Sequence, residues 1–218
     1  MEGNQIIEVL KVLERESRKW NKPYVEEVKK RTYDPFLVLV SCILSLRTKD
    51  EVTHQASRRL FLHAKTPEDI LKLGEKKISE LIYPVGFYRI KARNLVKISQ
   101  ILKVNYHSKV PDTVEELLKL PGVGRKTAAL VVSLGYGKPA ICVDTHVQRI
   151  ANRWGLVKTK TPEETERELK KRIPKDYWRL VNSILVAFGQ TICKPVSPFC
   201  SKCPVEKFCK RVGVERFR

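Results

Sequence analysis

Apolar residues recur along the chain at helical spacing, and residues that favour helix N-termini stand in front of them. The segment DPFLVLV places Asp34 as a helix N-cap before a proline, and TPEDILKL repeats this arrangement at Thr66. TPEETERELKK begins at Thr161 and adds Glu164 at the position of a capping box. Each of these segments therefore predicts a helix that begins next to its capping residue.

Two further stretches favour helices. PDTVEELLKL carries apolar residues along one helical face, with Asp112 or Thr113 as its N-cap. The longest apolar run, FLVLVSCILSL over residues 36–46, is shorter than the roughly 20 residues that span a bilayer and predicts a buried helix. Alternating β-branched runs flanked by hairpin turns are hard to find. We therefore predict an all-α fold without a membrane-spanning segment.

The charge balance narrows the possible functions. The 218 residues suffice for one large domain or two modest ones, and 42% of them are hydrophobic, as in a globular protein. Lys and Arg total 43 against 24 Asp and Glu, which gives a formal net charge of +19. Such a surplus favours a polyanionic partner, DNA or RNA above all. A solvated basic surface or a membrane-surface protein remains an alternative.

The N-terminal sequence and the cysteine content indicate a reducing compartment. MEGNQIIEVLKVLERESRKW has early acidic residues and lacks the layout of a signal peptide, so we expect a cytoplasmic or nuclear protein. Six cysteines in that setting indicate a metal site before disulfides. Cys42 and Cys142 lie among apolar residues and are expected to be buried thiols without chemistry.

The other four cysteines crowd the C-terminal segment CKPVSPFCSKCPVEKFCKR. They are separated by six, two and five residues, in the order Cys193, Cys200, Cys203 and Cys209. The segment has too few large apolar residues to be held folded by burial alone, so a bound centre is expected to fix it. Zinc sites more often use two well-separated C-x2-C pairs, and this compact run fits a [4Fe–4S] cluster better. Zinc and unligated thiols remain alternatives.

The stretch LPGVGRKTAALVVSLG, residues 120–135, is a candidate helix–hairpin–helix. Pro121 ends one helix, and Gly122 and Gly124 permit positive φ and close backbone approach. Backbone N–H groups around these glycines, at the start of the next helix, form a cradle suited to a phosphate. A plain glycine turn between two helices is the alternative.

Arg125 and Lys126 stand where the helix dipole disfavours cations. Both could bind phosphate as point charges. Alternatively, the dipole and the neighbouring guanidinium favour the neutral amine of Lys126, the form that a nucleophile or Schiff-base lysine requires. Asp144, in VDTHVQRIANRWG, is an acid that could act with this amine. An N-cap carboxylate is usually structural, however, and Thr145 competes as the cap. His146 could contact a phosphate or satisfy a local hydrogen bond.

LPGVGRKTA, VDTHVQRI and the four-cysteine spacing, in that order, resemble endonuclease III of the helix–hairpin–helix DNA glycosylase superfamily. LSLRTKD and GFYRIKA extend the resemblance over nearly the whole chain. The resemblance implies a bilobal all-α fold with a six-helix barrel domain over residues 23–136. Residues 1–22 and 137–218 would form a second domain, with the [4Fe–4S] cluster loop at 193–209. DNA would lie across the cleft between the two domains.

The resemblance also implies an activity, that of a bifunctional DNA glycosylase and AP lyase of base excision repair that acts on oxidised pyrimidines. Lys126 and Asp144 match the family's catalytic pair and its separation of 18 positions (144 − 126 = 18). Lys126 would attack C1′ of the deoxyribose and expel the flipped base, with assistance from Asp144. β-Elimination through the resulting Schiff base would cut the strand 3′ to the lesion. The four cysteines would hold the cluster.

Residues expected to contact DNA follow from the same resemblance. They are Leu120, Gly122, Val123, Gly124, Arg125, Arg47, Phe87 and His146. Many members carry glutamine at the position of Arg47 and leucine at that of Phe87. Arg47 and Phe87, here called the wedge pair, are expected to fill the gap left by the flipped base by stacking. Ser45 and Asp50 match the family as supports of the pocket.

The expected partner is duplex DNA with damaged bases or abasic sites, bound by a monomer in a prokaryotic nucleoid or a eukaryotic nucleus. Two other functions fit parts of the sequence. A monofunctional adenine, thymine or uracil mismatch glycosylase shares the fold but usually has another residue at the position of Lys126. A non-catalytic DNA-binding module with structural zinc would keep the hairpin and the basic charge without needing Asp144 opposite Lys126.

Overall fold

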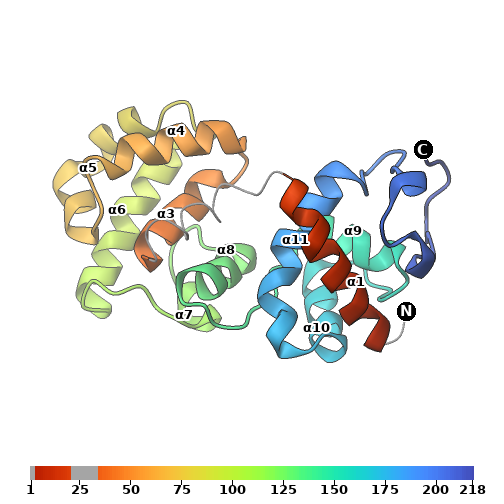
Figure 1. The fold of residues 1–218 in the computed structure, drawn as a ribbon. Helices are drawn as coiled ribbons and strands as arrows, with labels where there is room; N and C mark the ends of the chain where they lie inside the picture. Colours follow the sequence, from red (N-terminus) through yellow and green to blue (C-terminus); the bar gives the residue numbers. More distant parts are fainter. Residues whose placement is uncertain (1–2, 21–33) are drawn as a thin grey trace. The chain divides into compact units, whose positions relative to one another are not determined.

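The computed structural model describes residues 3–20 and 34–218, and every regular element in these ranges is helical (Figure 1). The predicted all-α fold is confirmed for this part of the chain. Among the η elements, η2 is a π-helix and the others are single 3₁₀ turns. The elements in chain order are α1 (Gly3–Glu16), η1 (Ser17–Lys19), α3 (Pro35–Ser45), α4 (Asp50–Phe61), α5 (Pro67–Ile82), α6 (Tyr88–Asn105), α7 (Val114–Leu117), α8 (Arg125–Leu130), η2 (Val131–Gly135), α9 (Thr145–Arg153), α10 (Pro162–Arg172), η3 (Lys175–Tyr177), α11 (Trp178–Thr191), η4 (Cys200–Lys202) and η5 (Glu206–Phe208).

The described residues form two compact units, one of residues 34–138 and one of residues 3–20 together with 139–218. The first unit contains α3 to α8 and η2. The second contains α1, α9, α10, α11 and the cysteine segment, so it is discontinuous in sequence. Within the described ranges, no helix has the length and apolar character needed to cross a membrane.

Helix α3 is the buried centre of the first unit. Every residue from Phe36 to Leu44 is buried, and the helix packs against α4, α6, α8 and η2. Its N-cap is Asp34, whose Oδ1 accepts a hydrogen bond of 2.8 Å from the backbone N–H of Phe36. The predictions of a buried helix and of its cap are both confirmed. Cys42, in the middle of α3, is 1% exposed and is a free thiol.

The other predicted caps are local features that the structure also contains. Thr66 and Thr161 begin α5 and α10, each with a reciprocal capping box to the acid three residues later. At the start of α7 the cap is Thr113, whose hydroxyl accepts from the backbone N–H of Glu116. Asp112 instead forms an ion pair with Lys138, at 2.5 Å between Oδ2 and Nζ.

The second unit is built around α11, which packs against both α1 and α9. Trp154 and Phe188 are each 1% exposed, and their ring centroids lie 6.2 Å apart. Full burial of one large apolar side chain contributes roughly 1.5–3 kcal/mol. The cysteine segment docks on this core, since three of its partly buried cysteines pack against it: Cys193, Cys203 and Cys209. The apolar face of α1 also belongs to this core, through Ile6, Val9, Leu10 and Leu13.

Candidate active site

The hairpin, residues 120–126, joins α7 to α8 through a turn that requires glycine. Gly122 has a φ of 77°, and a Cβ at this position would lie 2.6 Å from Nδ2 of Asn94 in α6. Gly124 is the N-cap of α8 and has no side chain with which to cap it. A helix N-terminus without a side-chain cap is suited to an anion, which can accept hydrogen bonds from the first backbone N–H groups of the helix.

Exposure divides the predicted hairpin contacts into two groups. Gly122, Gly124 and Arg125 are exposed. Leu120 and Val123 are 2% and 6% exposed, because their side chains point into the protein. These two residues can offer a ligand only their backbone groups.

Lys126 is exposed at the second position of α8, and its charge acts on two groups of the first unit, the thiol of Cys42 and the carboxyl of Asp50. Burial raises the pKa of the Cys42 thiol to about 12, and the positive charge of Lys126 opposes this effect. Desolvation also raises the pKa of Asp50, the first residue of α4, and Lys126 again acts in the opposite direction. Lys126 is thus within electrostatic reach of Asp50, which the resemblance assigned as a support of the pocket.

Asp144 is the N-cap of α9, and Thr145 is the first residue of that helix. Its Oδ1 accepts hydrogen bonds from the backbone N–H groups of His146, at 2.9 Å, and Val147, at 3.0 Å. These two bonds fix the carboxylate at the helix N-terminus, so the structural role that the sequence left open is present. A fixed carboxylate can also serve chemistry, because its position is set before a substrate arrives.

His146 and Arg149 connect the start of α9 to the first cysteine. Arg149 donates to the backbone oxygen of Cys193 at 2.9 Å and to that of Gly189 at 3.3 Å, and its NH2 lies 3.1 Å from Nδ1 of His146. A Cβ on Gly189 would lie 2.6 Å from Nδ1 of His146. The local hydrogen-bonding role considered for His146 therefore exists, and its contact with DNA stays a prediction.

The wedge pair is brought together by the structure. The guanidinium carbon of Arg47 lies 5.6 Å from the centroid of the Phe87 ring, within the range of a cation–π contact. Both residues have left-handed backbones, with φ of 52° for Arg47 and 58° for Phe87. Phe87 is 56% exposed although it is a large apolar side chain. Residues held in this backbone region cost of order 1–3 kcal/mol each and cluster at ligand sites.

Sequence reasoning missed Lys91 of α6, which is 6% exposed. Its ammonium donates to the backbone oxygens of Leu44 at 2.9 Å and Leu46 at 2.5 Å. Burial lowers the pKa of Lys91 to about 8. A signal was present, because Lys91 stands at helical spacing with the buried Leu95 and Ile98, on the face where a charge is unexpected.

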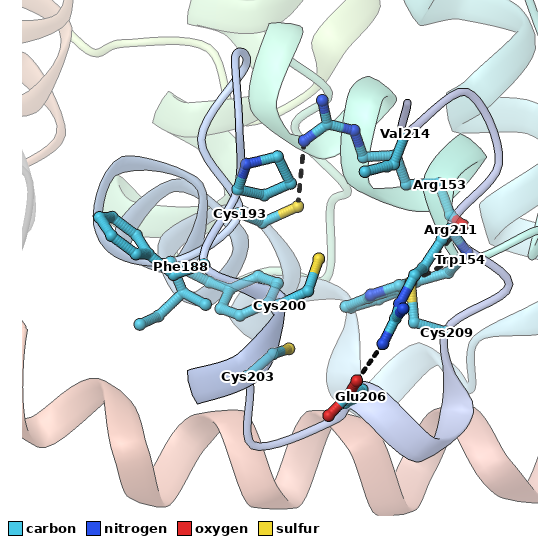
Figure 2. Close-up of a pocket in the computed structure, with 13 residues that line it drawn as sticks. Arg153, Trp154, Phe188, Cys193, Cys200, Cys203, Glu206, Cys209, Arg211 and Val214 are labelled. Carbon is cyan, nitrogen blue, oxygen red and sulfur yellow. Dashed lines mark hydrogen bonds and ion pairs between the residues drawn. The ribbon is translucent and has the colours of Figure 1, made fainter. Parts of the chain in front are cut away.

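The four clustered cysteines line one pocket, here called the cysteine pocket (Figure 2). Trp154 and Phe188 line this pocket, as do two positively charged residues, Arg153 and Arg211. Arg153 donates to Sγ of Cys193 at 3.5 Å and to the backbone oxygens of Lys194 and Pro195 at 2.7 and 2.6 Å. The structure therefore gathers the predicted ligand set, and Arg153 is a further residue at the site.

The thiols of the cysteine pocket are partly withdrawn from water. Burial raises the pKa of Cys203 to about 12 and raises those of Cys200 and Cys209 as well. The backbone N–H of Arg211 donates to Sγ of Cys209 at 3.4 Å. Among the described residues, no three His, Cys, Asp or Glu side chains converge closely enough to hold a metal ion.

Comparison with known proteins identifies the family to which this chain belongs. A model of the family described as "HhH-GPD superfamily base excision DNA repair protein" matches residues 40–175. The chain is 54% identical over 170 residues to endonuclease III of Thermotoga maritima, which covers 78% of this chain and 80% of that protein. This chain belongs to the endonuclease III family.

Two solved structures extend the similarity over both units. A trapped endonuclease III–DNA covalent intermediate matches with a TM-score of 0.83 and 34% identity, covering 97% of each chain. A thermostable thymine-DNA glycosylase matches with a TM-score of 0.81 and 27% identity, covering 95% of this chain and 96% of that one.

Proposed function

We propose that this protein is a bifunctional DNA glycosylase and AP lyase, which removes oxidised pyrimidines from duplex DNA and then cuts the strand 3′ to the abasic site. The observation that carries the proposal is Lys126, which is exposed at the end of the hairpin, two residues after Gly124. A lysine at this position can reach a sugar while the hairpin holds a neighbouring phosphate. The covalent intermediate of a structurally similar family member supports a covalent mechanism.

The chemistry requires an amine and a carboxylate at the same deoxyribose. The neutral amine of Lys126 adds to C1′, and the bond from C1′ to the base breaks with its electron pair leaving on the base. Asp144 accepts a proton from the amine and stabilises positive charge on the sugar. The C1′–O4′ bond then opens, O4′ takes up a proton, and the nitrogen of Lys126 becomes doubly bonded to C1′ as a Schiff base. In this Schiff base the C2′ proton is acidic, and its removal expels the 3′-phosphate with the electron pair of the C3′–O bond. Water then hydrolyses the Schiff base and releases Lys126.

Cys193, Cys200, Cys203 and Cys209 are the proposed ligands of a [4Fe–4S] cluster. The donor set fits a cluster of several metals better than a single ion, because all four thiols line one pocket although, among the described residues, no three side chains converge on one metal ion. Two N–H donors, on Arg153 and Arg211, also point at sulfur atoms. When bound, the cluster would supply metal–thiolate bonds that fasten the cysteine segment. The chain's own contribution is to dock that segment on the apolar core of the second unit.

The hairpin is the proposed grip on the DNA backbone, and Gly122→Ala tests it. Alanine at φ of 77° is strained and would also collide with the Asn94 amide, so the hairpin or the Asn94 side chain must shift. We expect the dissociation constant for an abasic duplex, measured by fluorescence anisotropy, to rise about tenfold. Gly74→Ala is the matched control, since Gly74 has a φ of 73° with open space around it. Equal binding losses in the two variants would contradict the assignment.

Incubation of the wild-type protein with a thymine-glycol duplex and borohydride tests the proposed function. We expect free base, a cut strand and a covalent protein–DNA adduct, because borohydride reduces the Schiff base. Base release without an adduct would point instead to a monofunctional enzyme. That second candidate is favoured by the similarity to the thymine-DNA glycosylase, and excision of thymine from a G·T mismatch would identify it.

The proposed partner is duplex DNA with damaged bases or abasic sites, bound by one copy of the chain. We place the protein in the nucleoid of a prokaryote, or in the nucleus if the source is eukaryotic. The formal net charge of +19 supports a nucleic-acid partner.

A further inference from the structure

Lys91 connects helix α6 to a loop that lies more than 40 residues earlier in the sequence. It lies in the first turn of α6, four residues after Phe87. All three acceptors of its ammonium come from the end of α3 and the loop that follows: Leu44 O at 2.9 Å, Leu46 O at 2.5 Å and Thr48 Oγ1 at 3.2 Å. An ammonium has three N–H donors, so this set uses all of them. Arg47 lies between the second and third acceptors.

Thr48 links the loop that carries Arg47 to the loop that carries Phe87. Its hydroxyl accepts from Lys91 and from the backbone N–H of Gly86, at 3.1 Å, and donates to Leu46 O at 3.2 Å. A hydroxyl has one donor and two acceptor sites, so Thr48 is saturated as well. Gly86 immediately precedes Phe87, and Thr48 immediately follows Arg47. Each hydrogen bond therefore fixes the backbone beside one member of the wedge pair.

The two loops also meet backbone to backbone. A Cβ on Gly86 would lie 2.6 Å from the carbonyl oxygen of Arg47, so glycine is needed for this approach. The approach brings Arg47 over the Phe87 ring, at 5.6 Å. Both members keep left-handed backbones, which persist only where the surrounding contacts over-determine them. Lys91 supplies three of those contacts from a buried position.

We propose that Lys91 is a positioning residue that holds the Arg47 and Phe87 loops at a fixed separation, so that the wedge pair can enter the duplex when the damaged base leaves it. The inference rests on the proposed function, because it assigns a step of that function to the wedge pair. Lys91 does not touch DNA in this proposal. It acts on the duplex only through Arg47 and Phe87.

A buried lysine kept only for stability is the competing interpretation. Packing alone would favour an apolar residue at this position, because a buried charge costs desolvation free energy. The two interpretations differ in which reaction they affect. Loss of stability lowers every activity in parallel, whereas loss of positioning lowers only those reactions in which a base must leave the stack.

The experiment compares Lys91→Met on two substrates under single-turnover conditions. On a thymine-glycol duplex we expect base release to slow by 10- to 100-fold, about the cost of a misplacement near 1 Å. On a single-stranded abasic oligonucleotide, which has no stacked base to extrude, we expect borohydride trapping to change less than about threefold. The fluorescence rise of 2-aminopurine placed beside the lesion reports extrusion directly, and we expect it to be lost.

Two further variants make the result decisive. Thr48→Val keeps the side-chain shape but removes the hydroxyl from the connection, so it should show the same pattern even if Lys91→Met does not fold. Lys103→Met removes an exposed lysine from the same helix and should behave as wild type. Equal losses on both substrates, or an unchanged 2-aminopurine signal, would overturn the inference. A wild-type protein that forms no adduct on either substrate would instead overturn the proposed function.

Discussion

Replacing Lys126 by glutamine is expected to abolish the borohydride adduct and to slow strand cleavage at an abasic site by on the order of 10³-fold or more. Glutamine has a similar length and can still accept or donate hydrogen bonds, but its amide nitrogen cannot form a Schiff base. The variant should still bind an abasic duplex, because the hairpin glycines and the N–H groups of α8 are unchanged. Loss of chemistry with retained binding is the pattern that a nucleophile predicts.

Arg125→Gln is the matched control for Lys126→Gln, since it removes a charge from the preceding exposed residue. We expect it to form the adduct at a normal yield and to weaken DNA binding, with a smaller dependence of affinity on salt. If Lys126→Gln still forms the adduct, another amine is the nucleophile. If Lys126→Gln and Arg125→Gln behave alike, both residues act as point charges on phosphate.

If the four cysteines hold the proposed [4Fe–4S] cluster, replacing Cys203 by serine is expected to remove its visible absorbance and to lower the thermal midpoint of unfolding strongly. Metal–thiolate bonding in small structural sites contributes on the order of 10 kcal/mol to folding. The cysteine segment buries few side chains of its own, because Pro198 and Val205 are the buried ones among its described residues. Cys203 itself packs against the core of the second unit, so its loss should spread beyond the segment.

The control for Cys203→Ser is Cys142→Ala, which removes a buried thiol of the same unit. It should cost stability through a small cavity while the absorbance per protein stays at the wild-type value. Absorption spectra and thermal unfolding of both variants check the prediction. If the Cys203→Ser protein keeps its colour and thermal midpoint, Cys203 is not a ligand of the cluster. If the wild-type protein is colourless and contains zinc, the four cysteines bind zinc and not a [4Fe–4S] cluster.

Local features of the sequence were predictable because they depend on neighbouring residues. The caps at Asp34, Thr66 and Thr161 are decided by residues two to three positions away, and the structure contains all three. The choice between Asp112 and Thr113 was not decidable in this way. In the structure Thr113 is the cap, and Asp112 forms an ion pair with Lys138, which is 26 residues away in the sequence.

In the candidate site, too, features that depend on neighbouring residues were predictable and features that depend on distant residues were not. The hairpin, the capping carboxylate and the cysteine set follow from short motifs, and the structure gathers the four cysteines around one pocket. The burial of Lys91 had a signal in its helical spacing, but its hydrogen-bond partners could not be predicted, because they lie 43 to 47 residues away at the end of α3 and in the loop that follows. The burial of Leu120 and Val123 could not be predicted either, since it depends on contacts with elements that are distant in the sequence.

The discontinuous second unit has a consequence for synthesis on the ribosome. Helix α1 is made long before α11, which begins at Trp178, yet the two helices pack together. At translation rates of about 5–20 residues per second, α1 waits roughly ten to thirty seconds for that partner. During this interval α11 does not yet cover the apolar face of α1, which includes Ile6 and Leu10. A chaperone that binds apolar helices can therefore bind α1 of the nascent chain before α11 has been synthesised.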